Sequence, residues 1–193
     1  MPIVGSFAGA SARAYGLGAG LALPGDFESI ASSTVGSGGA ATIDFTSIPQ
    51  TFSHLQIRGL GRNTVANSDD NIHIRFNSDT TANYSLHYLY GNGASAASGG
   101  NSNDNLIIPF RVPGSTSSAN IFGVGVVDIL DYTNTNKYKT VRSLTGHDQN
   151  GSGSAWLFSG NWRSTAAITS ISIFYGVNNI AQYSSFALYG VKA

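Results

Sequence analysis

The stretch Ser53–Gly61 (SHLQIRGLG) alternates apolar and polar residues with a period of two. Leu55, Ile57 and Gly59 share one face, and polar side chains occupy the positions between them. The next such run, Asn71–Phe76 (NIHIRF), repeats the pattern with isoleucine and phenylalanine at every second position. This period is typical of a β-strand with one buried face.

Outward from these two runs, short β-branched and aromatic segments recur between clusters of Gly, Ser, Asn and Pro. No long segment keeps the 3.6-residue period of a helix. Strands are predicted at Phe27–Thr34, Ala41–Phe45, Ser53–Gly61, Asn71–Phe76, Tyr84–Tyr90, Asn105–Phe110, Asn120–Leu130, Lys139–Thr145, Ala155–Asn161, Ile168–Phe174 and Ser185–Val191. We therefore expect an all-β fold, a jelly-roll-like antiparallel β-sandwich over residues 26–193.

Two details of the pattern predict positions within that sandwich. Asn120–Leu130 (NIFGVGVVDIL) is more evenly apolar than the other runs, which predicts a central strand. Glycine-rich and polar segments predict loops at Gly36–Gly39, Gly91–Asn105 and Asn150–Gly153, the second of them long.

Composition excludes several classes of protein. The 193 residues fit one domain, or one domain with an arm, and no apolar run approaches the length of about 20 residues that a membrane span needs. Ten basic residues balance ten acidic ones, so the basic stripe of an electrostatic nucleic-acid binder is absent. The chain has no cysteine, which excludes disulfides and thiolate metal sites. We expect neither nucleic-acid binding nor membrane insertion.

Residues 1–25 have a composition of their own. The segment is rich in Gly and Ala, and up to Leu23 its one charged residue is Arg13. Its glycines disfavour a helix, and it lacks the basic start and apolar core of a secretory signal. A disordered tail is one interpretation; we favour an extended docking arm that orders on a partner chain. Its apolar anchors would be Ile3, Val4, Phe7, Tyr15, Leu17 and Leu21.

The residues that usually carry catalysis are sparse. Glycosidases usually need two facing carboxylates, and this chain has one glutamate, Glu28, and nine aspartates. A calcium ion held by Asp69, Asp70, Asn71 and Asp79 is an alternative to ordinary turn chemistry, but the spacing matches no defined calcium loop.

Histidines and serines give no catalytic pattern either. His54, His73, His87 and His147 form no metal-binding motif, and no GxSxG sequence accompanies His147–Asp148. Adjacent residues on a strand also point to opposite faces, so these two would not easily orient one another. We expect no enzymatic activity, no catalytic residues, no cofactor and no metal.

Aromatic residues are the one positive indication of a binding site. The segment AWLFSGNWR places Trp156 and Trp162 on one strand face, with Arg163 beside the second. A sugar ring can stack its apolar face on such aromatics while polar residues bond its hydroxyls. Core packing is the favoured alternative, because aromatics fill sandwich interiors. We retain Trp156, Trp162 and Arg163 as a candidate glycan platform.

Four segments resemble small virion structural proteins of tailed bacteriophages, in particular tail-fibre-like and decoration-type β-sandwich proteins of aquatic phages. They are Asp26–Arg62, NYSLHYLYGNG (Asn83–Gly93), Asp128–Gly153 and AQYSSFALYGVKA (Ala181–Ala193). The leader MPIVGSFAGASARAYGL is similar to the start of phage tail and fibre-like proteins. The resemblance implies a non-enzymatic module repeated on the particle surface, and a homotrimer. It carries over no catalytic residue.

The expected function is therefore that of a virion structural protein, held to capsid or tail subunits by its arm. It would either belong to a tail fibre or appendage or decorate the head, and the leader favours the tail fibre or appendage. The alternative is an adhesin whose sandwich binds host surface glycan. A polysaccharide depolymerase is the least expected, given the carboxylate count.

Overall fold

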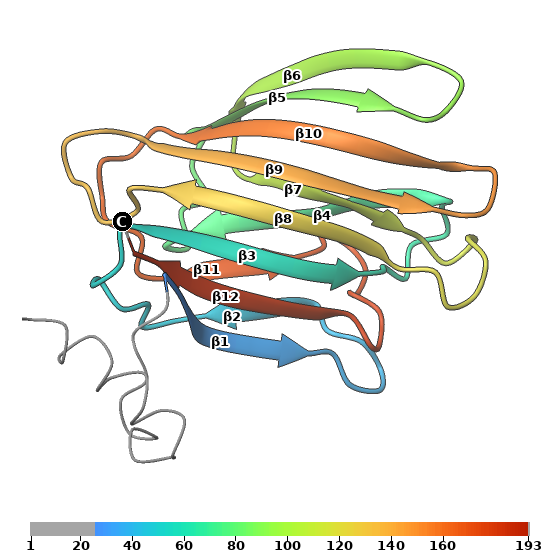
Figure 1. Ribbon diagram of the computed structural model, residues 1–193, viewed down its shortest axis with the longest axis horizontal. Helices are drawn as coiled ribbons and strands as arrows, with labels where there is room; N and C mark the ends of the chain where they lie inside the picture. Colours follow the sequence, from blue (N-terminus) through green and yellow to red (C-terminus); the bar gives the residue numbers. More distant parts are fainter. Residues whose placement is uncertain (1–25, 193) are drawn as a thin grey trace, which may run out of the picture.

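The computed structural model describes residues 26–192, and these form twelve β-strands (Figure 1). The predicted arm and its six anchors lie outside the described residues. The strands are β1 (Phe27–Thr34), β2 (Thr42–Phe45), β3 (His54–Gly61), β4 (Asp69–Phe76), β5 (Tyr84–Gly91), β6 (Ala96–Asp104), β7 (Ile107–Pro113), β8 (Gly123–Leu130), β9 (Lys139–Asp148), β10 (Gly153–Trp162), β11 (Ile171–Phe174) and β12 (Ser185–Val191). Residues 26–192 contain no helix of the length and apolar character that crossing a membrane requires.

The strands make two antiparallel sheets that pack face to face. The larger sheet has the order β1-β12-β3-β8-β9-β10-β5-β6, and the smaller has the order β2-β11-β4-β7. Eight of the strands pair from the outside of the chain inward: β1 with β12, β2 with β11, β3 with β8 and β4 with β7. This nested pairing, divided between two sheets, is the jelly-roll arrangement. The predicted all-β sandwich is confirmed.

The other four strands are two hairpins inserted into the jelly roll. One hairpin, β5–β6, lies between β4 and β7 in the chain, and the other, β9–β10, lies between β8 and β11. They meet through the β10–β5 pairing and extend the larger sheet beyond β8. In Figure 1 the smaller sheet lies behind the larger one, and β5 and β6 reach past it. We call these four strands the extension.

The core fills the space between the two sheets. The alternation that predicted β3 and β4 is confirmed, since Leu55, Ile57, Ile72, Ile74 and Phe76 are all buried. The rings of Phe110 and Phe186 contact edge to face, with centroids 5.5 Å apart, over glycines of the larger sheet. A Cβ atom on Gly125 would lie 2.5 Å from the Phe110 ring, and only glycine leaves the ring that room.

Strand β7 is the edge of the smaller sheet, and hydroxyl groups of the extension satisfy its outward backbone groups. Ser143 Oγ donates to the Pro109 carbonyl at 2.8 Å, and the Arg111 amide donates to Thr145 Oγ1 at 3.3 Å. Both side chains come from β9 and are buried. An edge strand needs such cover because its free backbone groups would otherwise pair with another chain.

Two expectations for individual segments have different outcomes. Asn120–Leu130 contributes β8, and this strand lies in the interior of the larger sheet, as predicted. The loop predicted for Gly91–Asn105 is wrong, because Ala96–Asp104 forms β6. Strand β6 is mostly exposed on both faces, so its sequence has no reason to alternate.

Candidate functional site

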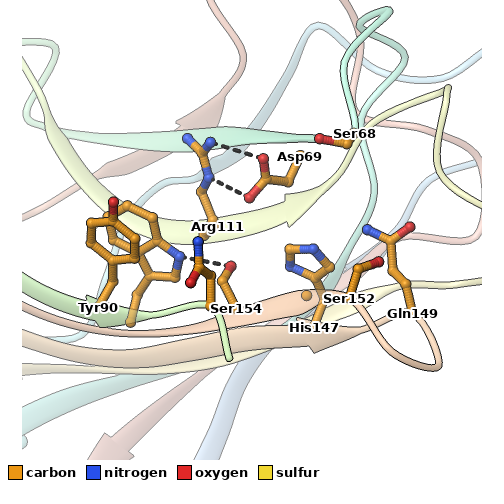
Figure 2. A pocket seen from close by; sticks show the side chains of 11 residues that line it. Ser68, Asp69, Tyr90, Arg111, His147, Gln149, Ser152 and Ser154 are labelled. Atoms are coloured by element: carbon orange, nitrogen blue, oxygen red, sulfur yellow. Dashed lines mark hydrogen bonds and ion pairs between the residues drawn. The ribbon is translucent and has the colours of Figure 1, made fainter. Parts of the chain in front are cut away.

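A pocket of about 350 Å³ opens at the end of the molecule where the β9–β10 hairpin turns (Figure 2). Strand β4 contributes Asp69, β7 contributes Arg111, β9 contributes His147 and β10 contributes Trp156. The other lining residues are Ser68, Tyr90, Asn92, Gln149, Ser152, Gly153 and Ser154. We call this the Trp156 pocket. It lies between the edge of the smaller sheet and the inner face of the extension.

An ion pair forms one wall of the Trp156 pocket. Arg111 donates from Nε to Asp69 Oδ2 and from Nη2 to Asp69 Oδ1, both at 2.9 Å, and from Nη1 to Asn71 Oδ1 at 3.0 Å. Both side chains of the pair are 22% exposed. This two-pronged geometry fixes the guanidinium in one plane, as Figure 2 shows. The pair therefore supplies polarity to the wall without net charge.

The opposite wall is aromatic. The rings of Tyr90 and Trp156, which are cross-strand partners on β5 and β10, stack with centroids 4.1 Å apart and planes at 10°. The guanidinium carbon of Arg111 lies 5.2 Å from the centre of the Trp156 ring, a cation–π distance. Trp156 also donates from Nε1 to Ser154 Oγ at 2.8 Å. These contacts hold the wall rigid in the absence of any ligand.

His147 lies between the two walls, at the end of β9. Its Nδ1 atom is buried and has no hydrogen-bond partner among the described residues. Burial lowers the pKa of His147 below its usual value of 6.5, with Asp69 opposing the effect and Arg111 adding to it. The imidazole is therefore neutral at pH 7, and the His147 side chain forms no hydrogen bond within residues 26–192. Asp148 is exposed and accepts a hydrogen bond from the Asn150 amide, so the two residues form no catalytic pair.

The turn of the β9–β10 hairpin positions the polar rim of the pocket. Asn150 and Gly151 both have positive φ, 55° and 110°, the geometry that an Asn-Gly pair favours in a hairpin turn. The Gln149 amide donates to the Ser152 carbonyl at 2.7 Å, which closes the turn. The side chains of Gln149 and Ser152 line the pocket (Figure 2) and form no hydrogen bond within the described residues.

The structure divides the predicted glycan platform. Trp156 lines the pocket, but Trp162 is 2% exposed and stacks on Tyr84 in the core, so it cannot contact a ligand. Both are on the inner face of β10, as predicted, but Trp162 lies where the smaller sheet still covers that face. Arg163 bonds the Ala82 carbonyl and Asn103 Oδ1, away from the pocket. For Trp162, core packing was the correct alternative.

The aspartates weighed as calcium ligands do not gather at one point. Asp69 and Asp70 begin β4, whereas Asp79 follows its far end. Asp69 pairs with Arg111, and Asp70 accepts a hydrogen bond from the Tyr175 hydroxyl at 2.7 Å. Within residues 26–192, no cluster of three or more His, Cys, Asp or Glu side chains is arranged to hold a metal ion.

A second feature lies on the outer face of the larger sheet, which no strand within residues 26–192 covers. Val126 of β8 pairs with Leu144 of β9, Leu144 with Leu157 of β10, and Leu157 with Leu89 of β5. Directly paired residues share a face, so these four side chains form a continuous row. They are 37%, 64%, 45% and 54% exposed, in that order. We call them the outer row; the exposed Leu60 and Val124 continue it on β3 and β8.

Polar residues and shallow hollows border the outer row. Gln56, Asp128 and Arg142 are cross-strand neighbours on the same face, and Arg142 pairs with Asp128 at 2.9 Å. Three hollows of about 300 to 400 Å³ adjoin the row, and Val126, Leu144 and Leu157 line them. Apolar ridges with hollows between them, rimmed by charge, are typical of a protein–protein interface.

Sequence reasoning named Trp156 as a binding residue, and Asp69 and His147 only in roles that the structure does not support; it missed Arg111. Arg111 follows directly after the predicted strand Asn105–Phe110, and nothing in its neighbourhood marks it as a site residue. The usable signal was the Tyr84–Tyr90 run, in which Tyr84, Tyr88 and Tyr90 share a face; it was not used to predict a partner for Trp156. In comparisons with known proteins, no protein-family model matches this chain, and no curated protein sequence matches it.

Proposed function

We propose that this chain is a non-enzymatic structural subunit of a tailed-phage particle, which assembles with copies of itself through the outer face of its larger sheet. The observation that carries the proposal is the outer row. Val126, Leu144, Leu157 and Leu89 expose a continuous apolar stripe across four strands that nothing within residues 26–192 covers.

The size of this face supports an interface. Strands lie about 4.8 Å apart and rise about 3.3 Å per residue. The five neighbouring strands that carry this face, β3, β8, β9, β10 and β5, therefore present roughly 600 Å². The whole eight-stranded face is on the order of 900 Å², comparable with the roughly 800 Å² that each partner contributes to a stable complex.

The charge of the chain favours a second copy as the occupant. Ten basic and ten acidic residues cancel, and charged residues make up only 10% of the chain, so no strong field selects an oppositely charged partner. A subunit held within an assembly also needs less surface charge than a free monomer. The homotrimer implied by the phage resemblance is the assembly that we propose.

The oligomer can be tested by light scattering on the full chain and on a Leu144→Glu variant. We expect a trimer of about 60 kDa, three times the chain mass of 20.1 kDa, and a monomer for the variant. Thr42→Glu places the same charge on an exposed position of the smaller sheet and should leave the assembly intact. A monomeric wild type at micromolar concentration, or an unchanged Leu144→Glu oligomer, would contradict the proposed interface.

The virion part of the proposal has its own test. Mass spectrometry of purified particles from the phage that encodes this chain should find it as a structural component. In the proposal, residues 1–25 attach it to capsid or tail subunits and the sandwich faces outward. Deleting residues 2–23 should leave the far-ultraviolet dichroism unchanged while incorporation is lost. Particles that lack the chain, or that take up the truncated protein at normal occupancy, would overturn these assignments.

A further inference from the structure

The Trp156 pocket combines an apolar wall with polar groups that have no partner inside the protein. We propose that it binds a neutral saccharide. Tyr90 and Arg111 occupy the faces of the Trp156 ring, so the edge of Trp156 and the ring of Tyr90 would contact C–H groups of a sugar. His147, Gln149 and Ser152, which also line the pocket, would bond its hydroxyls. This inference goes beyond the structural role and rests on a different surface, because the pocket lies on the inner face of the extension and the outer row lies on the opposite face.

The charges in the pocket favour a neutral ligand over an ionic one. Arg111 and Asp69 are its charged lining residues, and they neutralise each other through two hydrogen bonds of 2.9 Å. An acidic ligand would have to compete with Asp69 for the guanidinium, and a cation would have to compete with Arg111 for the carboxylate. A ligand that is polar but uncharged meets neither penalty.

The free hydrogen-bonding groups match a ligand rich in hydroxyls. The side chains of His147, Gln149 and Ser152 line the pocket and form no hydrogen bond within residues 26–192. Together they offer both donors and acceptors, which is what hydroxyl groups require because each can donate and accept.

The apolar wall is fixed before any ligand arrives. Tyr90 stacks on Trp156 at 4.1 Å, Arg111 lies over the Trp156 ring, and Ser154 holds its Nε1. A rigid aromatic wall loses little conformational entropy on binding. The pocket volume of about 350 Å³ is at the lower end of the range for small-molecule sites, which suits a short oligosaccharide segment and not a long chain.

Tryptophan fluorescence of the full chain provides a direct test, because the chain has two tryptophans and Trp162 is buried. We would titrate cellotriose, maltotriose and chitotriose, with trigalacturonate as the acidic counterpart. At least one neutral trisaccharide should change the emission saturably, and trigalacturonate should not. No saturable change with any of the three, or tighter binding of trigalacturonate, would overturn the proposal.

Variants then locate the site, with calorimetry as the readout. Trp156→Ala should weaken binding at least tenfold, and Gln149→Ala and His147→Ala should each weaken it severalfold, as expected for the loss of one hydrogen bond. Leu157→Ala is the matched control, because Leu157 is the next residue of β10 but faces the outer row; its affinity should not change. If Trp156→Ala unfolds, the two polar variants decide. Wild-type affinity in both, or an equal loss in Leu157→Ala, would contradict the assignment.

A positive result would support the adhesin function expected as the alternative from the sequence. It would not affect the proposed oligomer, whose test depends on Leu144, and a failed oligomer test would leave the pocket unchanged. The two proposals can therefore fail separately.

Discussion

The jelly roll and the extension use the same larger sheet but bury it differently. Under the jelly roll, β3 and β8 are covered by the smaller sheet, and their inner residues are buried along their whole length. Along the extension this cover diminishes: β9 is buried on its inner face over most of its length, β10 only near its end, β5 only at its start, and β6 hardly at all. The boundary is β7, where the smaller sheet ends.

The difference teaches where a binding site can form on such a fold. Where the second layer ends, Tyr88, Tyr90, Trp156 and Phe158 cover the inner face by packing their rings against one another. Large aromatic rings can shield a sheet without a second sheet, and they leave a ring face or edge accessible. The Trp156 pocket lies at this boundary, and it forms because the smaller sheet does not extend over the whole inner face of the extension.

The largest expected effect is in the two-layer part. Phe110→Ala removes a ring packed between Phe186 and the glycines of β3 and β8, and should lower the free energy of unfolding by about 3–5 kcal/mol. Urea unfolding followed by dichroism measures it. Tyr88→Ala, in the half-buried part of the extension, should cost clearly less. Equal losses would show that the extension is as tightly packed as the jelly roll.

The next effect concerns Asp79, which joins the two regions. It follows β4 and accepts a hydrogen bond of 2.8 Å from Trp162 Nε1 of β10. Burial alone would raise its pKa, but hydrogen bonds from Thr81, Trp162 and Asn83 outweigh burial and lower the pKa from 3.8 to about 2. Asp79→Ala leaves the indole N–H of a buried tryptophan unpaired and should cost about 1–3 kcal/mol at pH 7.

The contribution of Asp79 to the free energy of unfolding should depend on pH, and the lowered pKa gives the direction of that change. A carboxyl group whose pKa is lowered by folding stabilises the protein above its unfolded pKa, and this stability is lost as the pH falls through about 2. The difference in unfolding free energy between wild type and Asp79→Ala should therefore become smaller as the pH falls from 4 to 2. Asp79→Asn, which keeps an acceptor oxygen, should be milder at pH 7. A gap that is constant with pH would show that the charge is irrelevant.

A smaller effect is expected where the extension covers the edge strand β7. Ser143→Ala removes the hydroxyl that bonds the Pro109 carbonyl in a buried position and should cost about 1–2 kcal/mol. Ser159→Ala, on the exposed face of β10, is the control and should stay within about 0.5 kcal/mol. If Ser143→Ala is equally silent, water replaces the hydroxyl and the edge is not sealed by β9.

The smallest effect should come from the outer row. Leu144→Ala should change the unfolding free energy of the dissociated monomer by less than about 0.5 kcal/mol, because the side chain is 64% exposed. The measurement belongs at a protein concentration where light scattering shows monomer, with Phe110→Ala as the contrasting variant. A loss above 1 kcal/mol in the monomer would mean that part of the same chain already covers the row.

The residues predicted correctly are those whose burial differs between two faces. Leu55, Ile57, Ile72 and Ile74 alternate with polar neighbours because one sheet face is dry and the other wet, and this contrast is written directly into the sequence. Strand β6 has two wet faces, so Ala96–Asp104 carries no alternation and was predicted as a loop. Strand β8 looked evenly apolar for the opposite reason, since Val124 and Val126 face outward on the outer row.

The site was less predictable than the fold, because it depends on long-range register. Trp156 and Trp162 have the same parity on β10, but only the structure shows that the smaller sheet covers one and ends before the other. Arg111, Asp69 and His147 come from three strands that are far apart in the sequence, and no local pattern relates them. The sequence of one strand shows which residues share a face. Whether that face is buried depends on how far the opposing sheet extends, which the strand's own sequence does not show.

The nested pairing of the jelly roll also bears on how the chain folds. Phe27 of β1 pairs with Val191 of β12, so the larger sheet cannot be completed before almost the whole chain has left the ribosome. The β5–β6 and β9–β10 hairpins pair locally and can form while synthesis continues. Folds dominated by contacts between distant residues close slowly. Until β11 and β12 are made, β4 and β3 each have an unpaired edge, and these are the edges that a chaperone would have to protect.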